Sequence, residues 1–298
     1  MFWPLLKVGK PTIFKFWLIL HAIKKETLKQ LFEITGDGKE SVQPVLSIEL
    51  GEKHCCFSIT DFASQELQQL AYYNAEEIDE DFLTELFSSH PVLNNSFYQV
   101  LVCYDYPQSC LVPSKYYKPE DGSSLMSNMT GIPSASSVIA EAINEWQVNN
   151  IYIVPQKVHE RINKAFSTGK YWHRNTVNIK NNTATTEGGN LLVNFRNDDF
   201  TVLASANGQL LLAQVFSYST PDDVIFYLLK ICEQFGLKQQ EVNIYLSGLV
   251  EQQSALYREL HQYFLKVIFR NAAWVTPPNN ESPAHFFTSL NDLAKCAS

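Results

Sequence analysis

The residues best suited to chemistry lie close together in the stretch LSIELGEKHCCFSI, residues 46–59. Two apolar, β-prone segments flank a short turn that contains Glu49, Gly51, Glu52 and Lys53. Gly51 would let a ligand approach the backbone closely, and Lys53 would offer a positive charge to a phosphate group. Glu52 would repel the same group. The stretch is therefore a phosphate-binding loop, the remains of one, or an ordinary hairpin.

His54, Cys55 and Cys56 follow this turn and suggest a metal site or a nucleophile. Successive residues of a β-strand face opposite sides, so His54 and Cys56 share one face while Cys55 takes the other. This separation favours a packed strand over a site. No cysteine lies in a C-x-x-C pair, and we expect no zinc site and mostly reduced, buried thiols among the six cysteines: Cys55, Cys56, Cys103, Cys110, Cys232 and Cys296.

Two further polar clusters favour structural roles. His159 lies beside Glu160 and Arg161 in a predicted helix, where adjacent residues do not face each other. The segment KYWHR, residues 170–174, mixes aromatic and basic side chains, but one short patch favours an interface or a loop anchor over a nucleic-acid platform. The net charge of −8 also argues against general nucleic-acid binding, which needs an excess of Lys and Arg.

The second half of the chain predicts a regular series of elements. Asn207-Gly208 favours a tight type I′ turn between two strands. Thr220 and Pro221 are typical of a helix start, and Gly236 is typical of a helix end. The expected order is three strands, a helix, a strand and a helix, at 189–195, 200–205, 210–218, 220–236, 241–248 and 250–264.

The same series recurs earlier in the chain at a fixed offset of 145 residues. Subtracting this offset places strands at about 46, 55 and 66, a helix from Glu76 and a strand at about 97, and the sequence fits each of them. We interpret this as two copies of a βββαβα unit, each forming a mixed sheet, with a cleft between them. Residues 107–190 predict a helix and a strand–helix added to the first lobe, followed by a polar loop or hairpin.

The span 46–296 resembles an uncharacterised bacterial family, typical of Bacteroidota, that adopts the actin-like ATPase fold. The resemblance rests on LSIEL and CCFSI, on VLVCYDYPQSCLVPSKYY, on GGNLLVNFRNDDFTVLASANGQLLLAQVF and on HFFTSLNDLAKC. It implies an α/β protein with two RNase H-like βββαβα lobes facing a cleft, and it brings no known substrate or reaction. We accordingly divide the chain into an extension (1–45) outside the core, a first lobe with insertions (46–185) and a second lobe (186–298).

In active members of the actin-like superfamily, the first hairpin carries an Asp that orients magnesium-bound water, then Gly and small residues that cradle phosphate. Here Glu49 stands in place of that Asp, Gly51 is kept, and Glu52 and Lys53 replace the small residues. An unneutralised carboxylate about 4 Å from a phosphate charge costs on the order of 4 kcal/mol. Micromolar affinity amounts to about 8 kcal/mol in total, so this repulsion is severe.

The other two nucleotide motifs are also incomplete. The second hairpin reads Asn194-Phe195-Arg196-Asn197-Asp198 and has no Gly, while the adenosine element, normally a Gly pair, reads Ser247-Gly248-Leu249. We therefore predict a hairpin that has the shape of a phosphate loop but little of its chemistry. The sequence predicts no catalytic residue and no metal ligand, and the candidate cleft residues are Glu49, Gly51, Glu52, Lys53, Asn194, Arg196, Asn197, Asp198, Ser247 and Gly248.

Three functions remain open. The first is a non-catalytic scaffold or adaptor without a cofactor, bound to a protein partner and not to nucleic acid. The second is a diverged ATPase or kinase that uses ATP with magnesium, because Glu49 has the same charge as the Asp it replaces. The third is a peripheral membrane platform resembling the actin-like proteins of secretion or pilus systems.

Membrane contact would depend on residues 1–45, which carry a net charge of +3 against −11 for the remainder. The segment PTIFKFWLILHAIKK is interrupted by Lys15 and is far shorter than the roughly 20 apolar residues that span a bilayer. No cleavage site follows it. An amphipathic surface helix, a helix packed on the main body and a leader from an over-extended start codon all stay open, and we expect a cytoplasmic protein by default.

Overall fold

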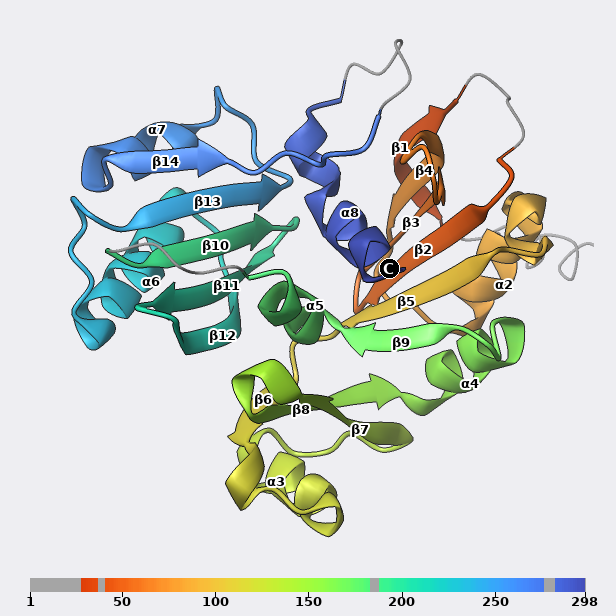
Figure 1. Ribbon diagram of the computed structural model, residues 1–298, viewed down its shortest axis with the longest axis horizontal. Coiled ribbons are helices and arrows are strands. Elements are labelled where there is room, and N and C mark those ends of the chain that lie inside the picture. Colours follow the sequence, from red (N-terminus) through yellow and green to blue (C-terminus); the bar gives the residue numbers. More distant parts are fainter. Residues whose placement is uncertain (1–27, 37–40, 183–187, 276–281, 298) are drawn as a thin grey trace, which may run out of the picture.

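The computed structural model describes residues 28–36, 41–182, 188–275 and 282–297. Three β-sheets are arranged with helices on their faces and between them (Figure 1). The first sheet has the order β1 (Lys29–Thr35), β4 (Leu67–Asn74), β3 (His54–Asp61), β2 (Pro44–Gly51), β5 (Gln99–Asp105) and β9 (Lys170–His173). The second has the order β12 (Gln209–Ser217), β11 (Asp199–Ala206), β10 (Asn190–Phe195), β13 (Asn243–Gly248) and β14 (Lys266–Phe269).

The two large sheets repeat one topology, as the fixed offset predicts. The order β4-β3-β2-β5-β9 matches β12-β11-β10-β13-β14, and in each the first three strands are antiparallel and the rest are added in parallel. The register agrees as well, since Glu49 pairs with Cys56 in one lobe and Asn194 with Thr201 in the other. The α/β fold with two facing lobes is thus confirmed.

The helices extend this repeat further than the sequence predicts. The first lobe continues with α2 (Glu80–Ser89), α4 (Gln156–Ala165) and α5 (Arg174–Lys180), and the second continues with α6 (Pro221–Phe235), α7 (Ala255–Tyr263) and α8 (Thr288–Ala294). In both, the second helix leads into an added parallel edge strand, β9 or β14, and the third helix follows that strand. The insertion is therefore confined to the third sheet, β6 (Ser109–Pro113), β8 (Val148–Pro155) and β7 (Ser136–Ile143), with α3 (Gly122–Met129).

Some local expectations are wrong. The helix expected from Glu76 begins at Glu80, because the side chain of Asp79 accepts a hydrogen bond from the Phe82 N–H at 2.8 Å and caps the helix there. The helix expected over the start of the insertion ends at Met129, and Ser136–Ile143 form strand β7, paired with β8. Residues 175–180, expected as loop or hairpin, lie in helix α5 (Arg174–Lys180), and residues 183–187 lie outside the described part.

The predicted limits of the lobes also need correction. Residues 29–35, assigned to an extension outside the core, form β1 and pair antiparallel with β4 at the edge of the first sheet. At the other end of the chain, α8 belongs by sequence to the second lobe but packs on β2, β3 and β5 as well as on β13. Its Leu290 and Leu293 join apolar clusters of the first lobe, which explains this position. Figure 1 shows α5 and α8 between the two sheets.

Each lobe has its own core on the face away from α5 and α8. The first core joins β2 and β3 to α2 and α4, and the second joins β10, β11 and β13 to α6 and α7. The expected signals of the second lobe are confirmed: Asn207 and Gly208 both have positive φ, as a type I′ turn needs, and Thr220 and Asp223 form a capping box. All six cysteines are free and buried or half-buried.

Candidate functional site

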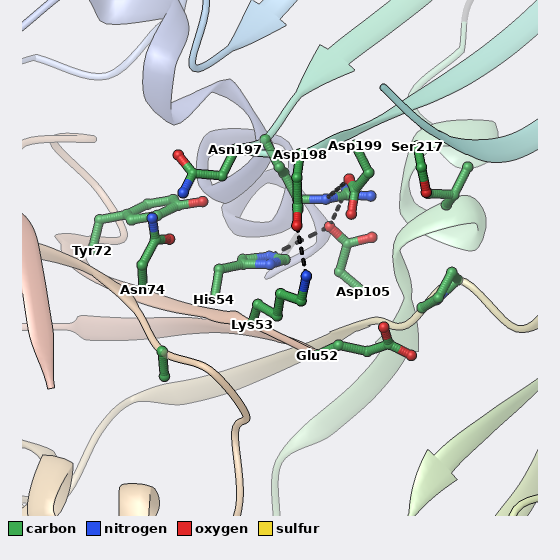
Figure 2. Close-up of a pocket in the computed structure, with 14 residues that line it drawn as sticks. Glu52, Lys53, His54, Tyr72, Asn74, Asp105, Asn197, Asp198, Asp199 and Ser217 are labelled. Atoms are coloured by element: carbon green, nitrogen blue, oxygen red, sulfur yellow. Dashed lines mark hydrogen bonds and ion pairs between the residues drawn. The ribbon is translucent and has the colours of Figure 1, made fainter. Parts of the chain in front are cut away.

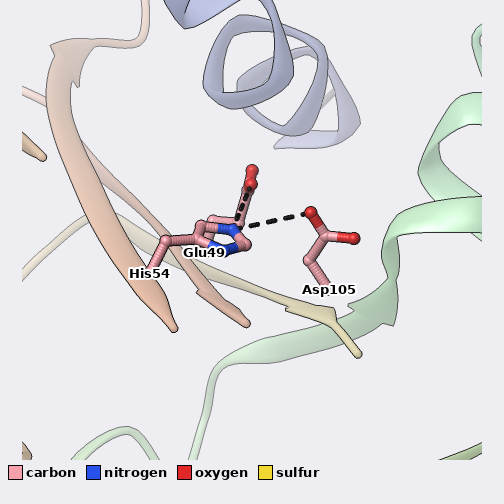
Figure 3. A group of neighbouring side chains, drawn as sticks. All are labelled: Glu49, His54 and Asp105. Atoms are coloured by element: carbon pink, nitrogen blue, oxygen red, sulfur yellow. Dashed lines mark hydrogen bonds and ion pairs between the residues drawn. The ribbon is translucent and has the colours of Figure 1, made fainter. Parts of the chain in front are cut away.

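The charged residues of the first lobe converge where its central strands end. Glu49 lies near the end of β2, Asp105 is the last residue of the parallel strand β5, and His54 opens β3. Figure 3 shows His54 between the two carboxylates, with Nε2 3.1 Å from Glu49 Oε1 and 3.5 Å from Asp105 Oδ2. All three are buried, with 2%, 6% and 3% of Glu49, His54 and Asp105 exposed. The arrangement places two carboxylates around one imidazole in a buried site.

Two arginines complete this group, one from each lobe. Arg174, the first residue of α5, donates to Glu49 Oε2 and also to the Ser289 carbonyl on α8 at 3.1 Å. Arg196 comes from the turn between β10 and β11 and reaches across from the second lobe. It donates to Asp105 Oδ2 at 2.6 Å and to Asp199 Oδ1 at 2.5 Å. Each carboxylate of the first lobe is thereby paired with a buried guanidinium.

The site is electrically balanced by its own side chains. Burial alone would lower the pKa of His54, but hydrogen bonds to Asp105 and Glu49 raise it to about 9, so the imidazole is charged at neutral pH. Burial acts to raise the pKa of Glu49 and of Asp105, yet the neighbouring arginines and His54 hold both below their usual values. With Asp199 included, the site holds three acidic side chains and three basic ones. We call this set the cleft network: Glu49, His54, Asp105, Arg174, Arg196 and Asp199.

The cleft network does not fit a magnesium–nucleotide. Glu49, His54 and Asp105 have the donor types of a metal site, and their ligand atoms lie within 4.8 Å of one another. However, a metal would have to displace the His54 proton and would sit beside two guanidinium groups that already neutralise the carboxylates. Such a substitution adds positive charge to a buried site that is already balanced. The chemistry of the donor set therefore argues against the metal.

A small cavity above the network opens between the lobes, as Figure 2 shows. Its volume is about 170 Å³, below the roughly 300–1,000 Å³ of usual ligand pockets. Lys53 and Asp198 form an ion pair of 2.6 Å across it, and both side chains are more than half exposed. These two residues are 145 positions apart, so the tips of the two equivalent hairpins contact each other. The Lys53–Asp198 ion pair thus spans the cleft at its surface, and the side chains of the cleft network lie buried beneath it.

Contacts within the protein engage the expected first-hairpin residues. Gly51 is needed for packing, because a Cβ at this position would lie 2.2 Å from the His54 ring. Lys53 is committed to Asp198. Glu52 is exposed, and its Oε1 accepts a hydrogen bond from the Gln108 side chain at 3.3 Å.

The second-lobe candidates at the ends of β10 and β13, Asn194 and Ser247, carry no charge. The Ser247 hydroxyl donates to Asn194 Oδ1 at 3.1 Å, so these two satisfy each other. Gly248 has φ +79, and a Cβ there would lie 2.1 Å from the Phe195 carbonyl oxygen. Phe195 itself is a buried core residue, and neither Phe195 nor Arg196 has a positive φ. Asn197 is exposed on the cavity wall.

Four residues of the cleft network were not predicted as site residues: His54, Asp105, Arg174 and Asp199. His54 was assigned to a packed strand and Arg174 to an interface or a loop anchor. The usable signal was Asp105, because a carboxylate that ends an apolar parallel strand next to β2 must lie beside Gly51. Arg174 had no such signal, since its partner Glu49 is 125 residues away. Asp199 lies only three residues after Arg196 on the same hairpin, and that short spacing was the signal that sequence reasoning did not use.

Comparison with known proteins now gives the family. The sequence model of a family described as a protein of unknown function, DUF3822, matches residues 35–267. This chain belongs to the DUF3822 family. No curated protein matches its sequence.

Solved structures similar to this DUF3822 chain show the fold. A Bacteroides thetaiotaomicron protein with an actin-like ATPase fold and unknown function is 21% identical, with a TM-score of 0.71, and the match covers 87% of this chain and 98% of that one. The PilM–PilN type IV pilus biogenesis complex is similar at 12% identity and a TM-score of 0.53, over 85% of this chain and 98% of that one. The protein thus has the actin-like ATPase fold. No helix in its described residues is long and apolar enough to cross a membrane.

Proposed function

We propose that this protein is a non-catalytic scaffold or adaptor with an actin-like fold, which binds a protein partner and no nucleotide. The observation that carries the proposal is the cleft network. In an active member the carboxylates of the first lobe meet magnesium and phosphate. In this chain Arg174, His54 and Arg196 already supply the positive charge. A nucleotide would have to break buried ion pairs, each costing several kcal/mol to disrupt.

The second lobe supports the same proposal. Asn194 lacks the charge to orient a metal, and it is engaged by Ser247. Arg196 is held in the cleft by hydrogen bonds to Asp105, Asp199 and Thr201, and its positive charge leaves no need for a metal there. The similarity to a solved PilM–PilN complex adds a further reason to propose a protein partner for this fold.

Calorimetry with magnesium-ATP tests the proposal on the full chain. We expect no binding tighter than millimolar and no release of phosphate. The Glu52→Gln variant should also bind nothing, because removing one exposed carboxylate leaves the buried network intact. Unchanged circular dichroism and melting would show that both proteins are folded.

The diverged ATPase is the second candidate, and the metal-type donor set of Glu49, His54 and Asp105 is the observation that favours it. Its signature would be micromolar binding of magnesium-ATP by the wild-type chain that is lost in Asp105→Asn, which replaces a carboxylate by an amide of equal size. That result would overturn the scaffold proposal.

The membrane platform stays a prediction, and strand β1 limits which residues could contact a membrane. Residues 29–35 belong to the first sheet, so membrane contact would have to come from residues 1–27, which lie outside the described part. Pelleting with anionic vesicles should compare the full chain with residues 28–298. Equal behaviour of the two proteins would remove the basis for this alternative.

A further inference from the structure

The edges of the two large sheets differ in how they are protected. Unpaired edge strands present open backbone N–H and C=O groups, and proteins usually guard them with charges or by keeping them short. Two edges, β9 and β14, are four residues long and carry Lys170 and Lys266. A third, β1, carries Lys29 and Glu33. The fourth edge, β12, is nine residues long and reads QLLLAQVFS, without a charge, Pro or Gly.

The internal repeat shows what this edge can accept. β12 occupies the place in the second sheet that β4 occupies in the first. The outer edge of β4 is covered by β1, which pairs antiparallel with it from Lys29–Asn74 to Thr35–Gln69. Among the described residues, no strand pairs with the outer edge of β12. The unit therefore accommodates an antiparallel strand at this edge, and the second lobe leaves the equivalent place open.

The surface next to β12 is apolar and has room for a strand. Leu211, Leu212 and Phe216 are only half-buried. The Phe216 ring lies 4.6 Å from that of Tyr227 on α6, and Tyr227 lies 5.5 Å from Phe226, which is 55% exposed. A groove of about 500 Å³ lies along Gly208–Leu212 and is bounded on its far side by residues of the third sheet such as Leu111. This is the kind of exposed apolar patch that marks an interaction surface.

We propose that a second copy of this chain binds here, with the two β12 strands paired antiparallel about a two-fold axis to join the second sheets of two molecules. A two-fold axis brings only the strand residues next to it close to their own copies, so a charge near the middle of the strand would repel itself. β12 carries no charge in any of its nine residues, so no register of the pair is repulsive. The edges β9 and β14 have only four residues each, which is too short for a comparable pairing. Exposed Phe226 lies beside the seam and extends the contact beyond the strand.

The proposal is independent of whether the cleft binds ATP, so the two can fail separately. Sedimentation of the full chain at micromolar concentrations should give twice the monomer mass of 34.0 kDa. Gln214 is exposed near the middle of β12. Gln214→Lys should weaken the dimer about tenfold or more, because the two lysines would meet across the axis. Gln214→Glu should do the same.

An equal mixture of Gln214→Lys and Gln214→Glu should restore the dimer, because opposite charges now meet. The control is Ile268→Lys on β14, the opposite edge of the same sheet, where Ile268 is 47% exposed. It should leave the mass unchanged. A monomeric wild-type chain would overturn the proposal. A dimer that ignores both Gln214 substitutions, or one that Ile268→Lys disrupts equally, would overturn it too.

Discussion

The two lobes share a topology but differ in the charge they bring to the cleft. The first lobe supplies two buried carboxylates and a charged imidazole at the ends of its central strands. At the equivalent strand ends of the second lobe lie Asn194 and Ser247, which are neutral and bonded to each other. The charges that the second lobe contributes to the cleft network are Arg196, directed at Asp105, and Asp199, which pairs with Arg196. The first lobe has kept acidic groups of the kind that catalysis needs, and the second supplies a cation that neutralises one of them.

Under the proposed non-catalytic function, this difference explains how the site keeps its shape without binding a metal. An acid that no longer orients a metal would be a buried, unpaired charge, which costs several kcal/mol. Arg174 and Arg196 remove that cost by pairing with Glu49 and Asp105. The predictions below test this comparison between the charged strand ends of the first lobe and the neutral strand ends of the second.

The largest effect is expected at Arg174. Arg174→Ala leaves Glu49 buried without its guanidinium partner, and we expect a loss of about 3–5 kcal/mol in the free energy of unfolding. Ser247→Ala, in the neutral second lobe, should cost only about 1 kcal/mol. Urea denaturation measures both. Equal losses would erase the proposed contrast between the lobes, whereas the double variant Glu49→Gln/Arg174→Met should regain much of the stability.

The second prediction concerns pH. The pKa of His54 is raised from 6.5 to about 9 in the folded protein, so its contribution is complete below about pH 6.5 and is lost as the pH rises through 9. The free energy of unfolding should fall by about 3 kcal/mol or less over this range. His54→Gln should flatten the dependence. An alkaline slope of the same size in that variant would assign the effect to other groups.

The third prediction concerns Gly248, the glycine of the expected adenosine element in the second lobe. Gly248→Val introduces a Cβ 2.1 Å from the Phe195 carbonyl oxygen, at a φ of +79. We expect it to lower the free energy of unfolding by about 2–3 kcal/mol. The matched control is Gly236→Ala, at φ +66 with no atom within 4 Å of the added Cβ, which should cost only about 1 kcal/mol. Thermal melting that moves equally in both variants would mean that the close contact at Gly248 is relieved elsewhere.

The smallest effect is expected at the bridge between the hairpin tips. Lys53 and Asp198 are exposed, and a double-mutant cycle of Lys53→Ala and Asp198→Ala should give a coupling of about 0.2–1 kcal/mol. The coupling should shrink further in 0.5 M salt, because exposed pairs are screened. A coupling above about 2 kcal/mol at high salt would show that this bridge, and not the buried network, holds the lobes together.

How much the sequence could predict depended on the range of each signal. Strands, caps and the type I′ turn at Asn207-Gly208 are local, and the repeat added long-range information because one unit could be checked against the other. Glu76 was taken as a helix start because it continues an acidic run, whereas the capping side chain of Asp79 decides the true start. β1 was missed because no described strand of the second lobe corresponds to it.

The site was only partly predictable for a related reason. Glu49 and Arg196 were identified through loop positions, but their partners Arg174 and Asp105 are 125 and 91 residues away. His54 looked like a packed strand residue, and it is one. Its charge follows from two acids that only the folded chain brings to it.

The helices between the lobes have a consequence for inheritance and folding. α8 covers the first sheet although it is encoded at the end of the second copy, and α5 contacts β11 and β12 although it ends the first. Ile179 of α5 packs with Leu203, and Leu293 of α8 packs with Leu101. Neither half of the gene therefore encodes a complete hydrophobic surface for itself. The two repeats therefore depend on each other during synthesis: until α8 has been made, the first sheet lacks one of the helices that cover its inner face.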